Sequence, residues 1–127
     1  MMNKKPTHIS PTPTELAILG ALWQIGQGTV REIHQALNNS TGQSTTLKMV
    51  QVMTEKKLLI RDESVRPQVY SPALPQEQTQ LQMIDELILR AFGGSASELV
   101  LRAASAERIS AKELAEIKKL IEKAKTK

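Results

Sequence analysis

The chain has 127 residues, enough for one domain of ordinary size or for two small helical units. It contains no cysteine, which excludes disulfide bonds and thiolate metal sites, and no apolar run approaches the roughly 20 residues of a membrane span. Because a signal-peptide core is also missing, we expect a cytoplasmic protein. The 17 Lys and Arg against 13 Asp and Glu give a net charge of +4, which permits binding to a polyanion without proving it.

The first ordered element is predicted to be a helix, and residues 1–11 before it are expected to form a mobile arm. Thr12 is a candidate N-cap, Pro13 suits the first helical position, and Glu15 completes a capping box. Gly26 is expected to end this helix. Its buried face is predicted from the apolar residues at helical spacing, which are Leu16, Leu19, Leu22 and Trp23.

A second capping box predicts the start of the next helix. Thr29 is followed three residues later by Glu32, and the helix is expected to end in the turn-forming cluster Asn38–Gly42. His34 lies beside the apolar stripe and His8 lies in the arm. Because the two histidines are far apart in the sequence, we expect them to be structural or surface residues, and we expect no metal or cofactor.

The segment Gln43–Leu59 predicts a third helix with two different faces. The face expected to dock on the core carries Leu47, Val50, Met53 and Leu58. The opposite face carries Thr45, Lys48, Met49, Val52 and Lys56. Its hydroxyl, ammonium and small apolar groups suit the major groove of DNA, so this helix is interpreted as a recognition helix. A solvated helix face is the alternative, and this helix alone does not decide between them.

A change of periodicity after the third helix predicts a β-hairpin. Leu58–Arg61 is expected to form a strand, Asp62–Ser64 a turn, and Val65–Tyr70 the returning strand, in which Pro67 favours an edge position. Three short helices followed by a hairpin are typical of a winged helix, in which the third helix enters the groove and the hairpin lies along the DNA backbone. Arg66 would then be the contact made by the wing.

The second half of the sequence is predicted to be purely helical. One helix is expected from about Gln76 to a break at Gly93 and Gly94, and capping pairs predict two more. The capping pairs are Ser95 with Glu98 and Ser110 with Glu113. Because these helices have wide apolar faces and few aromatics, we expect them to bury those faces against a second copy of the chain. The predicted dimer interface comprises Leu81, Ile84, Ile88, Phe92, Leu99, Leu114, Ile117 and Ile121.

The predicted fold class is therefore mainly α with a small β-hairpin wing. A winged helix-turn-helix domain is expected at residues 12–74, followed by an α-helical dimerisation domain at residues 75–127. A two-fold dimer would place its recognition helices about one DNA turn apart, roughly 34 Å, and would require a palindromic site on double-stranded DNA. The residues predicted to contact DNA are Ser44, Thr45, Thr46, Lys48, Met49, Val52 and Arg66. The outer face offers no Arg, Asn or Gln for reading bases unless Gln43 or Gln51 turns toward it.

Four segments together resemble the penicillinase-repressor family of winged-helix repressors (the BlaI/MecI type, with the related copper repressor CopY). They read TELAILGALWQIGQGTVREIHQAL, STTLKMVQVMTEKKLL, RPQVYSP and FGGSASELV, and the resemblance covers about residues 12–125. It implies a homodimeric transcriptional repressor that binds inverted repeats near its target genes. It also implies a sensor protease that cleaves the repressor within its dimerisation half.

The sequence departs from that family pattern at several positions. The family's glycine at the end of the recognition helix is replaced by Lys57, which would cost on the order of 1 kcal/mol if a left-handed backbone is needed there. A basic residue late in that helix is replaced by Val52. The cleavage pair, Asn followed by Phe, is replaced by Arg102 and Ala103, which puts cleavage at this bond in doubt. The cysteine-rich tail of the copper repressors is absent, which excludes metal sensing by that route.

Two other classes of function are alternatives to the DNA-binding repressor. A winged helix used only for protein–protein contact is the first, and sequence-selective DNA binding would exclude it. An enzyme is the second, but no paired carboxylates, nucleophile–histidine pair, phosphate-binding loop or metal cluster is visible. The acidic residues that stand out have capping roles, so no catalytic residue is predicted.

Overall fold

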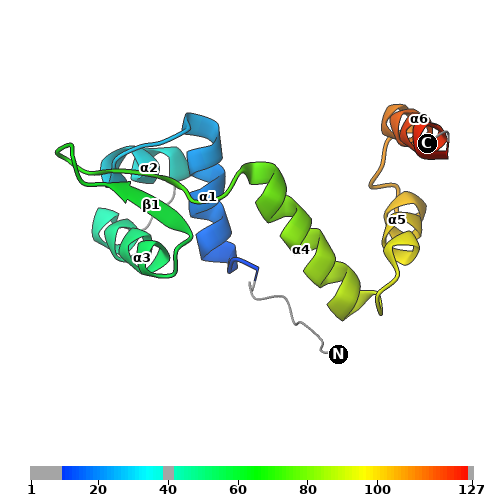
Figure 1. The fold of residues 1–127 in the computed structure, drawn as a ribbon, viewed down its shortest axis with the longest axis horizontal. Coiled ribbons are helices and arrows are strands. Elements are labelled where there is room, and N and C mark those ends of the chain that lie inside the picture. The colour runs from blue at the N-terminus through cyan, green and yellow to red at the C-terminus, as the bar shows by residue number, and fades with distance from the viewer. Residues whose placement is uncertain (1–9, 39–41, 126–127) are drawn as a thin grey trace. The chain divides into compact units, whose positions relative to one another are not determined.

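The computed structural model describes residues 10–38 and 42–125 (Figure 1). The described residues do not include positions 1–9 of the predicted arm, among them His8, or positions 39–41 of the predicted turn. Among the described residues there are six helices and one two-stranded antiparallel hairpin, so the predicted fold class is confirmed. Contacts divide the chain into two compact units, one ending at Met83 and the other beginning at Ile84.

The first two helices begin at the predicted capping boxes. In α1, Pro13–Ile25, the Thr12 hydroxyl accepts from the Glu15 amide at 3.2 Å, and the Glu15 carboxylate accepts from the Thr12 amide at 3.0 Å. The same reciprocal pair, at Thr29 and Glu32, opens α2, Val30–Leu37. Each box satisfies two amides that have no partner inside the helix, which is why the sequence locates these starts so well.

The third helix, α3, is Gln43–Glu55 and is shorter than predicted. It ends because Lys57 adopts a left-handed backbone with φ +67°, after which the Leu58 amide donates to the Met53 carbonyl at 2.9 Å. This bond back across the last turn is the usual way of closing a helix at a left-handed residue. The predicted extension to Leu59 was wrong, because the chain turns at Lys57 and Leu59 starts the first strand.

The hairpin is formed by β1, Leu59–Asp62, and β2, Val69–Pro72, in antiparallel register. The predicted returning strand began at Val65, but the residues before Val69 belong to the loop between the strands. Backbone bonds also join Gly28 to Tyr70, at 3.0 Å and 2.8 Å, so the α1–α2 connection lies along the other edge of β2. A Cβ on Gly28 would come within 2.9 Å of the tip of the exposed Ile25 side chain, which would have to move aside.

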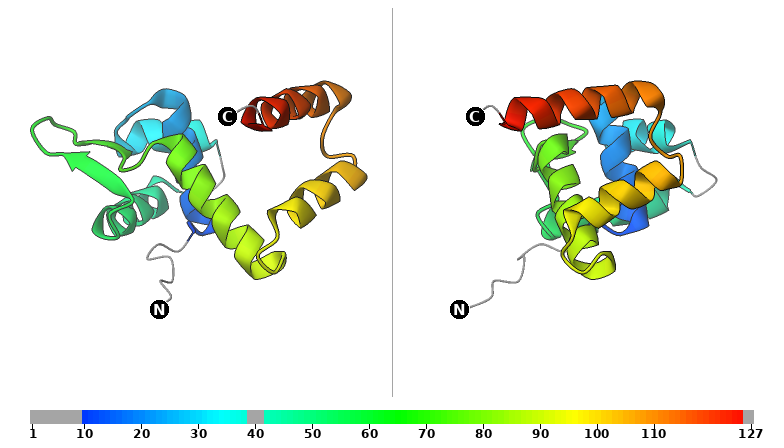
Figure 2. Two further views of the ribbon diagram at one scale, coloured as in Figure 1. Left: turned by 45° about the vertical axis from the view of Figure 1, so that its right-hand side comes forward. Right: turned by 90° about the vertical axis from the view of Figure 1, so that its right-hand side faces the viewer.

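The helices and the hairpin of the first unit share one hydrophobic core. Figure 2 shows α1, α2 and α3 packed together, with the hairpin extending beyond them. The buried cluster draws on all five elements and consists of Ile18, Leu19, Leu22, Ile33, Val50, Met53, Leu59 and Tyr70. Trp23 is half-buried and packs against this cluster, as expected for a core aromatic. This core fixes the orientation of α3 relative to the wing.

The remaining helices are α4, Gln76–Ala91, α5, Ala96–Ser105, and α6, Ala111–Lys125. The break after α4 is confirmed, because Gly93 and Gly94 both adopt positive φ angles. At α5 the Ser95 hydroxyl accepts from the Glu98 amide at 3.1 Å; Glu98 pairs with Arg102 instead of reaching back to the cap. The box at the start of α6 is complete. Within the described ranges, no helix combines the length and the apolar character that crossing a membrane requires.

Candidate nucleic-acid interface

The side of α3 that faces away from the core is an exposed strip, which we call the α3 strip. It consists of Ser44, Thr45, Leu47, Lys48, Gln51, Val52 and Glu55. Four of the residues predicted to contact DNA therefore lie in it: Ser44, Thr45, Lys48 and Val52. Lys48 forms no ion pair with any residue in the described ranges, so its ammonium is available to an external anion.

Thr46 lies on the inner side of α3 and does not face outward as predicted. It is 3% exposed, and its hydroxyl shares a hydrogen bond of 2.9 Å with Nδ1 of His34 on α2. A buried hydroxyl needs such a partner, since leaving it unpaired costs free energy. Thr46 therefore holds the two helices of the helix-turn-helix together and leaves the set of candidate DNA contacts. His34 has the structural role that the sequence suggested.

Two apolar residues of α3 are exchanged relative to the prediction. Leu47 was expected in the core but is 40% exposed, whereas Met49 was expected outside but is half-buried against the core. The docked face is centred on Thr46, Val50 and Met53, so it is rotated from the one drawn through Leu47. This rotation also places Gln51 in the α3 strip, one helical turn from Lys48.

The wing carries two cations that are already engaged. Arg61 pairs with Glu63 at 3.0 Å, and Nη1 of Arg66 donates to the carbonyl of Glu63 at 3.1 Å. At the start of the loop, hydrogen bonds from the hydroxyl and amide of Ser64 lower the pKa of Asp62. Arg66 is exposed, but the negative charges of Asp62 and Glu63 in the same hairpin offset much of the positive charge of the two arginines.

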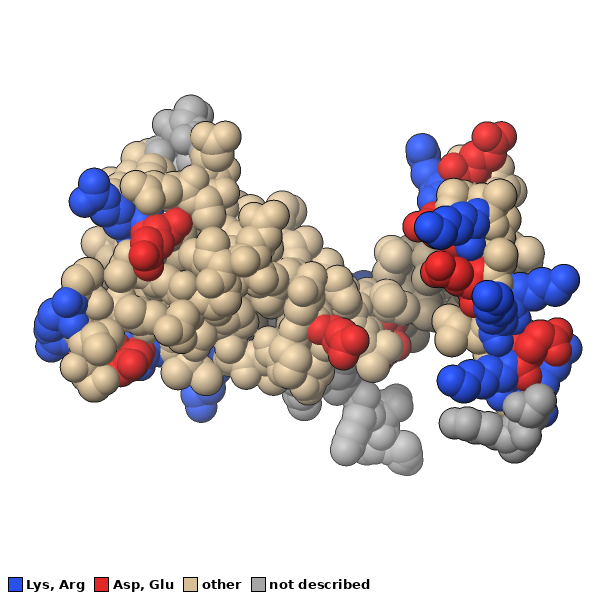
Figure 3. Space-filling view, turned by 90° about the horizontal axis from the view of Figure 1, so that it is seen from above, with Lys and Arg blue, Asp and Glu red and all other residues tan. Residues whose placement is uncertain are grey.

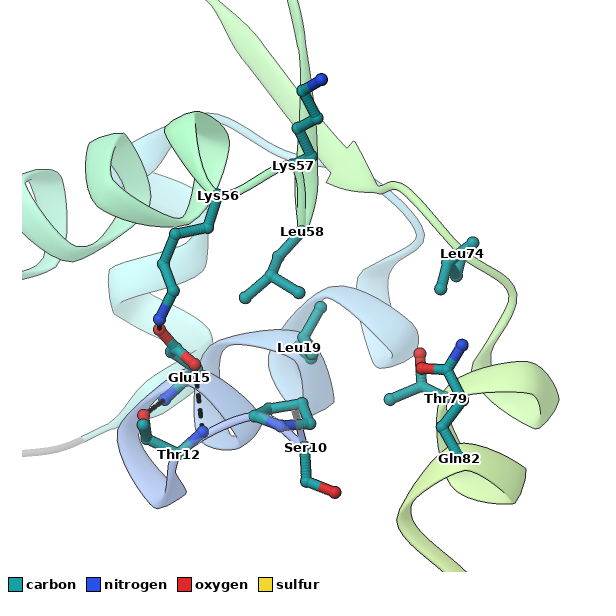
Figure 4. Close-up of a pocket in the computed structure, with 11 residues that line it drawn as sticks. Ser10, Thr12, Glu15, Leu19, Lys56, Lys57, Leu58, Leu74, Thr79 and Gln82 are labelled. Atoms are coloured by element: carbon teal, nitrogen blue, oxygen red, sulfur yellow. Dashed lines mark hydrogen bonds and ion pairs between the residues drawn. The ribbon is translucent and has the colours of Figure 1, made fainter. Parts of the chain in front are cut away.

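Lys56, at the end of α3, is bound within the first unit instead of being presented on the outer face. Its ammonium lies 2.6 Å from the carboxylate of Glu15, whose side chain is 4% exposed (Figure 4). Burial alone would raise the pKa of Glu15, but the hydrogen bonds from Lys56 and Thr12 outweigh it and lower that pKa. This ion pair connects the first turn of α1 to the residue that follows α3.

The residues predicted to form a dimer interface are not buried within one chain. Four are exposed, Leu81, Ile84, Leu114 and Ile121, and four are half-buried, Ile88, Phe92, Leu99 and Ile117. The second unit also bears cationic and anionic side chains interspersed on the face that Figure 3 displays. That face therefore does not present charge of a single sign to a polyanion. The described residues of this unit also include several exposed leucines and isoleucines.

The described residues contain no group of three His, Asp or Glu side chains placed to hold a metal ion. Comparison with curated proteins gave no match. The family model described as penicillinase repressor matches residues 11–123, which include every helix and strand from α1 to α5 and most of α6. The chain therefore belongs to the penicillinase repressor family, a family of transcriptional repressors.

Proposed function

We propose that the protein represses transcription by binding an inverted-repeat operator as a homodimer, with the α3 strip in the major groove. The observation that carries this proposal is the outward strip itself. It places an unpaired ammonium, an amide and small apolar groups along one side of a helix that a buried core holds rigidly. Such a combination suits phosphates, base edges and thymine methyls in one groove.

Within the α3 strip, we assign two kinds of contact. Lys48 reaches a phosphate or a guanine, and Gln51 is suited to hydrogen-bond an adenine edge. Ser44 and Thr45, in the first turn of α3, are near its positive dipole end and suit a phosphate oxygen. Val52 is 37% exposed and suits a thymine methyl. Glu55 disfavours phosphate nearby, which limits the contact to the N-terminal part of α3.

Dimerisation in this proposal involves the helices of residues 75–127. Their exposed apolar side chains are what a homodimer interface buries. A single strip with one unpaired lysine gives modest affinity, so two linked half-sites are needed for selective binding. The half-sites are expected about one helical turn apart, roughly 34 Å.

The proposal is tested by selecting genomic DNA fragments with the purified full-length protein at near-physiological salt and sequencing what binds. An enriched inverted repeat with half-sites about one turn apart supports it. Sequence-blind binding that disappears with added salt contradicts it and favours a winged helix used for protein contact.

Two substitutions then locate the contact surface on the selected operator. Lys48→Ala is expected to weaken binding and to reduce the salt slope by about one unit per half-site. Gln51→Ala is expected to relax selectivity at one base pair while leaving that slope unchanged. Arg66→Ala should weaken binding less than Lys48→Ala, because the guanidinium already donates to the wing backbone. Equal losses for Lys48→Ala and Lys112→Ala, which lies on α6, would remove the α3 strip from the interface.

A further inference from the structure

The first unit contains a cavity of about 550 Å³ at the base of the recognition helix. Its walls come from the start of α1 and the residues before it, the turn between α3 and β1, Leu74 in the β2–α4 connection, and the first turns of α4 (Figure 4). Ligand pockets in proteins typically measure about 300–1,000 Å³ and have mostly apolar walls with a few polar groups. The size of this cavity therefore falls in the range of a small-molecule site.

Three leucines provide most of the apolar wall. Leu19 belongs to the core and is buried, whereas Leu58 and Leu74 are half-buried because one side of each faces the cavity. Figure 4 shows Leu58 and Leu19 on one side of the space, with Leu74 and α4 on the other. An apolar molecule between them would cover leucine surface that the chain itself leaves uncovered, which is favourable in water.

Thr79 supplies a polar group to the wall of the cavity. It is 6% exposed and lines the cavity, and its hydroxyl makes no hydrogen bond with any residue in the described ranges. Gln82, one helical turn further along α4, lies beside it in Figure 4. The Thr79 oxygen is not among the described buried atoms that lack a partner, so it is open to water in the cavity. A ligand that donates to it or accepts from it would replace that water.

The charges around the cavity favour a neutral ligand. The Glu15 carboxylate and the Lys56 ammonium neutralise one another at 2.6 Å. The side chain of Lys57 is directed away from the space between Leu58 and Thr79 in Figure 4. A charged molecule would therefore lose its hydration without gaining an unpaired opposite charge.

We propose that this cavity binds a small, neutral, mainly apolar organic molecule that carries a hydroxyl or carbonyl group, with that group on Thr79. Two wall residues, Lys56 and Leu58, lie in the turn that follows α3, and the Leu58 amide closes that helix on Met53. A bound molecule therefore acts on the residues that hold the recognition helix. Binding does not depend on the proposed repressor function; only an effect on operator affinity does.

Cyclohexanol is the probe, and the leucine methyl resonances of the full-length protein are the readout. We expect saturable shifts of the methyls of Leu19, Leu58 and Leu74. Cyclohexylammonium and cyclohexanecarboxylate, which have the same ring with a charge, should bind at least about ten-fold more weakly, since each would bury an uncompensated charge. Shifts spread over the exposed leucines of α4–α6, unsaturated shifts, or equal binding of the charged probes would overturn the proposal.

Two variants test whether the probe binds in this cavity and whether it uses the Thr79 hydroxyl. Thr79→Val keeps the shape and removes the hydroxyl, so it should weaken cyclohexanol binding about five-fold while the unliganded spectrum stays folded. Leu74→Trp should fill the cavity and abolish the shifts, whereas Ile60→Trp, on the exposed side of β1, should leave them unchanged. Unaltered binding to Leu74→Trp would place the probe elsewhere and refute the assignment.

An operator titration then distinguishes the ligand site from the proposed function. If saturating cyclohexanol changes operator affinity in the wild type and not in Leu74→Trp, the cavity regulates DNA binding. If the methyl shifts saturate but operator affinity is unchanged, the cavity binds ligands without acting on the recognition helix. That result would overturn the coupling through Lys56 and Leu58 and leave the binding site itself intact.

Discussion

The two units of the chain use the same apolar residue types in opposite ways. In the first unit, the apolar faces of α1, α2 and α3 meet one another and the hairpin, so Leu22 and Ile33 have no exposed surface. In the second unit, α5 and α6 contain no buried residue, and Leu101 and Leu120 are about two-thirds exposed. The periodic pattern that predicts a helix thus says which face is apolar, but not whether the same chain covers it. The first unit has a buried core of its own, and we propose that the exposed apolar residues of α4, α5 and α6 are covered by another copy.

The strongest test of this difference removes one leucine from each unit. Leu22→Ala should lower the free energy of unfolding by about 3 kcal/mol, because the fully buried side chain leaves a cavity behind. Leu101→Ala, at an exposed position, should change it by less than about 0.5 kcal/mol. Urea unfolding followed by the fluorescence of Trp23, the only tryptophan, reports on the first unit directly. Similar losses for both variants would break the comparison.

The next test concerns the face through which the second copy is proposed to bind. Leu81 and Leu89 lie on α4 and are each 58% exposed, but Leu89 is outside the predicted interface. Leu81→Asp should weaken dimerisation by about ten-fold or more, since it buries a charge in an apolar contact. Leu89→Asp is the matched control and should leave the dimer nearly intact in sedimentation equilibrium. If Leu89→Asp dissociates the dimer and Leu81→Asp does not, the predicted face is wrong.

The ion pair between Glu15 and Lys56 sharpens the comparison, because it belongs entirely to the first unit. Lys56→Met should lower the free energy of unfolding by about 1–2 kcal/mol at neutral pH, since Glu15 is buried and Lys56 only partly so. The folded-state pKa of Glu15 lies below its ordinary value of 4.5, so the pair stabilises the fold above that pH. Its contribution should disappear as the pH falls through the lowered pKa.

The measurement is the difference in unfolding free energy between the wild type and Lys56→Met as a function of pH. We expect this difference to shrink below about pH 4.5, where Glu15 becomes protonated in the unfolded chain and then in the folded one. It should not depend on protein concentration, because no second copy takes part. A difference that stays constant to pH 3, or one that grows with concentration, would contradict the assignment.

The smallest expected effect is a gain in stability. Lys57 has φ +67°, in the region where a side chain is strained, so Lys57→Gly should raise the free energy of unfolding by up to about 1 kcal/mol. Glu55→Gly, in the last turn of α3 where no positive φ occurs, should lower it. Thermal unfolding of the two variants side by side tests whether the left-handed turn is the cause.

The sequence predicted those parts of the fold that depend on neighbouring residues. The capping boxes at Thr12 and Thr29 are satisfied within four residues, and Gly93 and Gly94 break α4 through their own backbone freedom. The sequence also indicated that Lys57 stands where the family has a glycine, and the structure shows a left-handed backbone there. Fold class and most element starts therefore followed from the sequence, as did the family.

The errors arose where distant residues decide the outcome. Thr46 is drawn inward by His34, twelve residues away, and no helical wheel contains that contact. Leu47 and Met49 exchanged roles because the wheel shows an apolar sector without showing which edge of it docks. The pairing of Gly28 with Tyr70 joins segments more than forty residues apart. The DNA contacts and the dimer interface remain proposals, since each requires a partner.

The central claim is that the first unit is held by its own core, while the second is completed only by another copy. Amide hydrogen exchange of the wild type, measured over a wide range of protein concentrations, tests it most directly. We predict that protection of α1–α3 is independent of concentration, whereas protection of α5 and α6 rises with concentration through the dimerisation range. Protection of α5 and α6 that persists unchanged in dilute, monomeric protein would contradict the account.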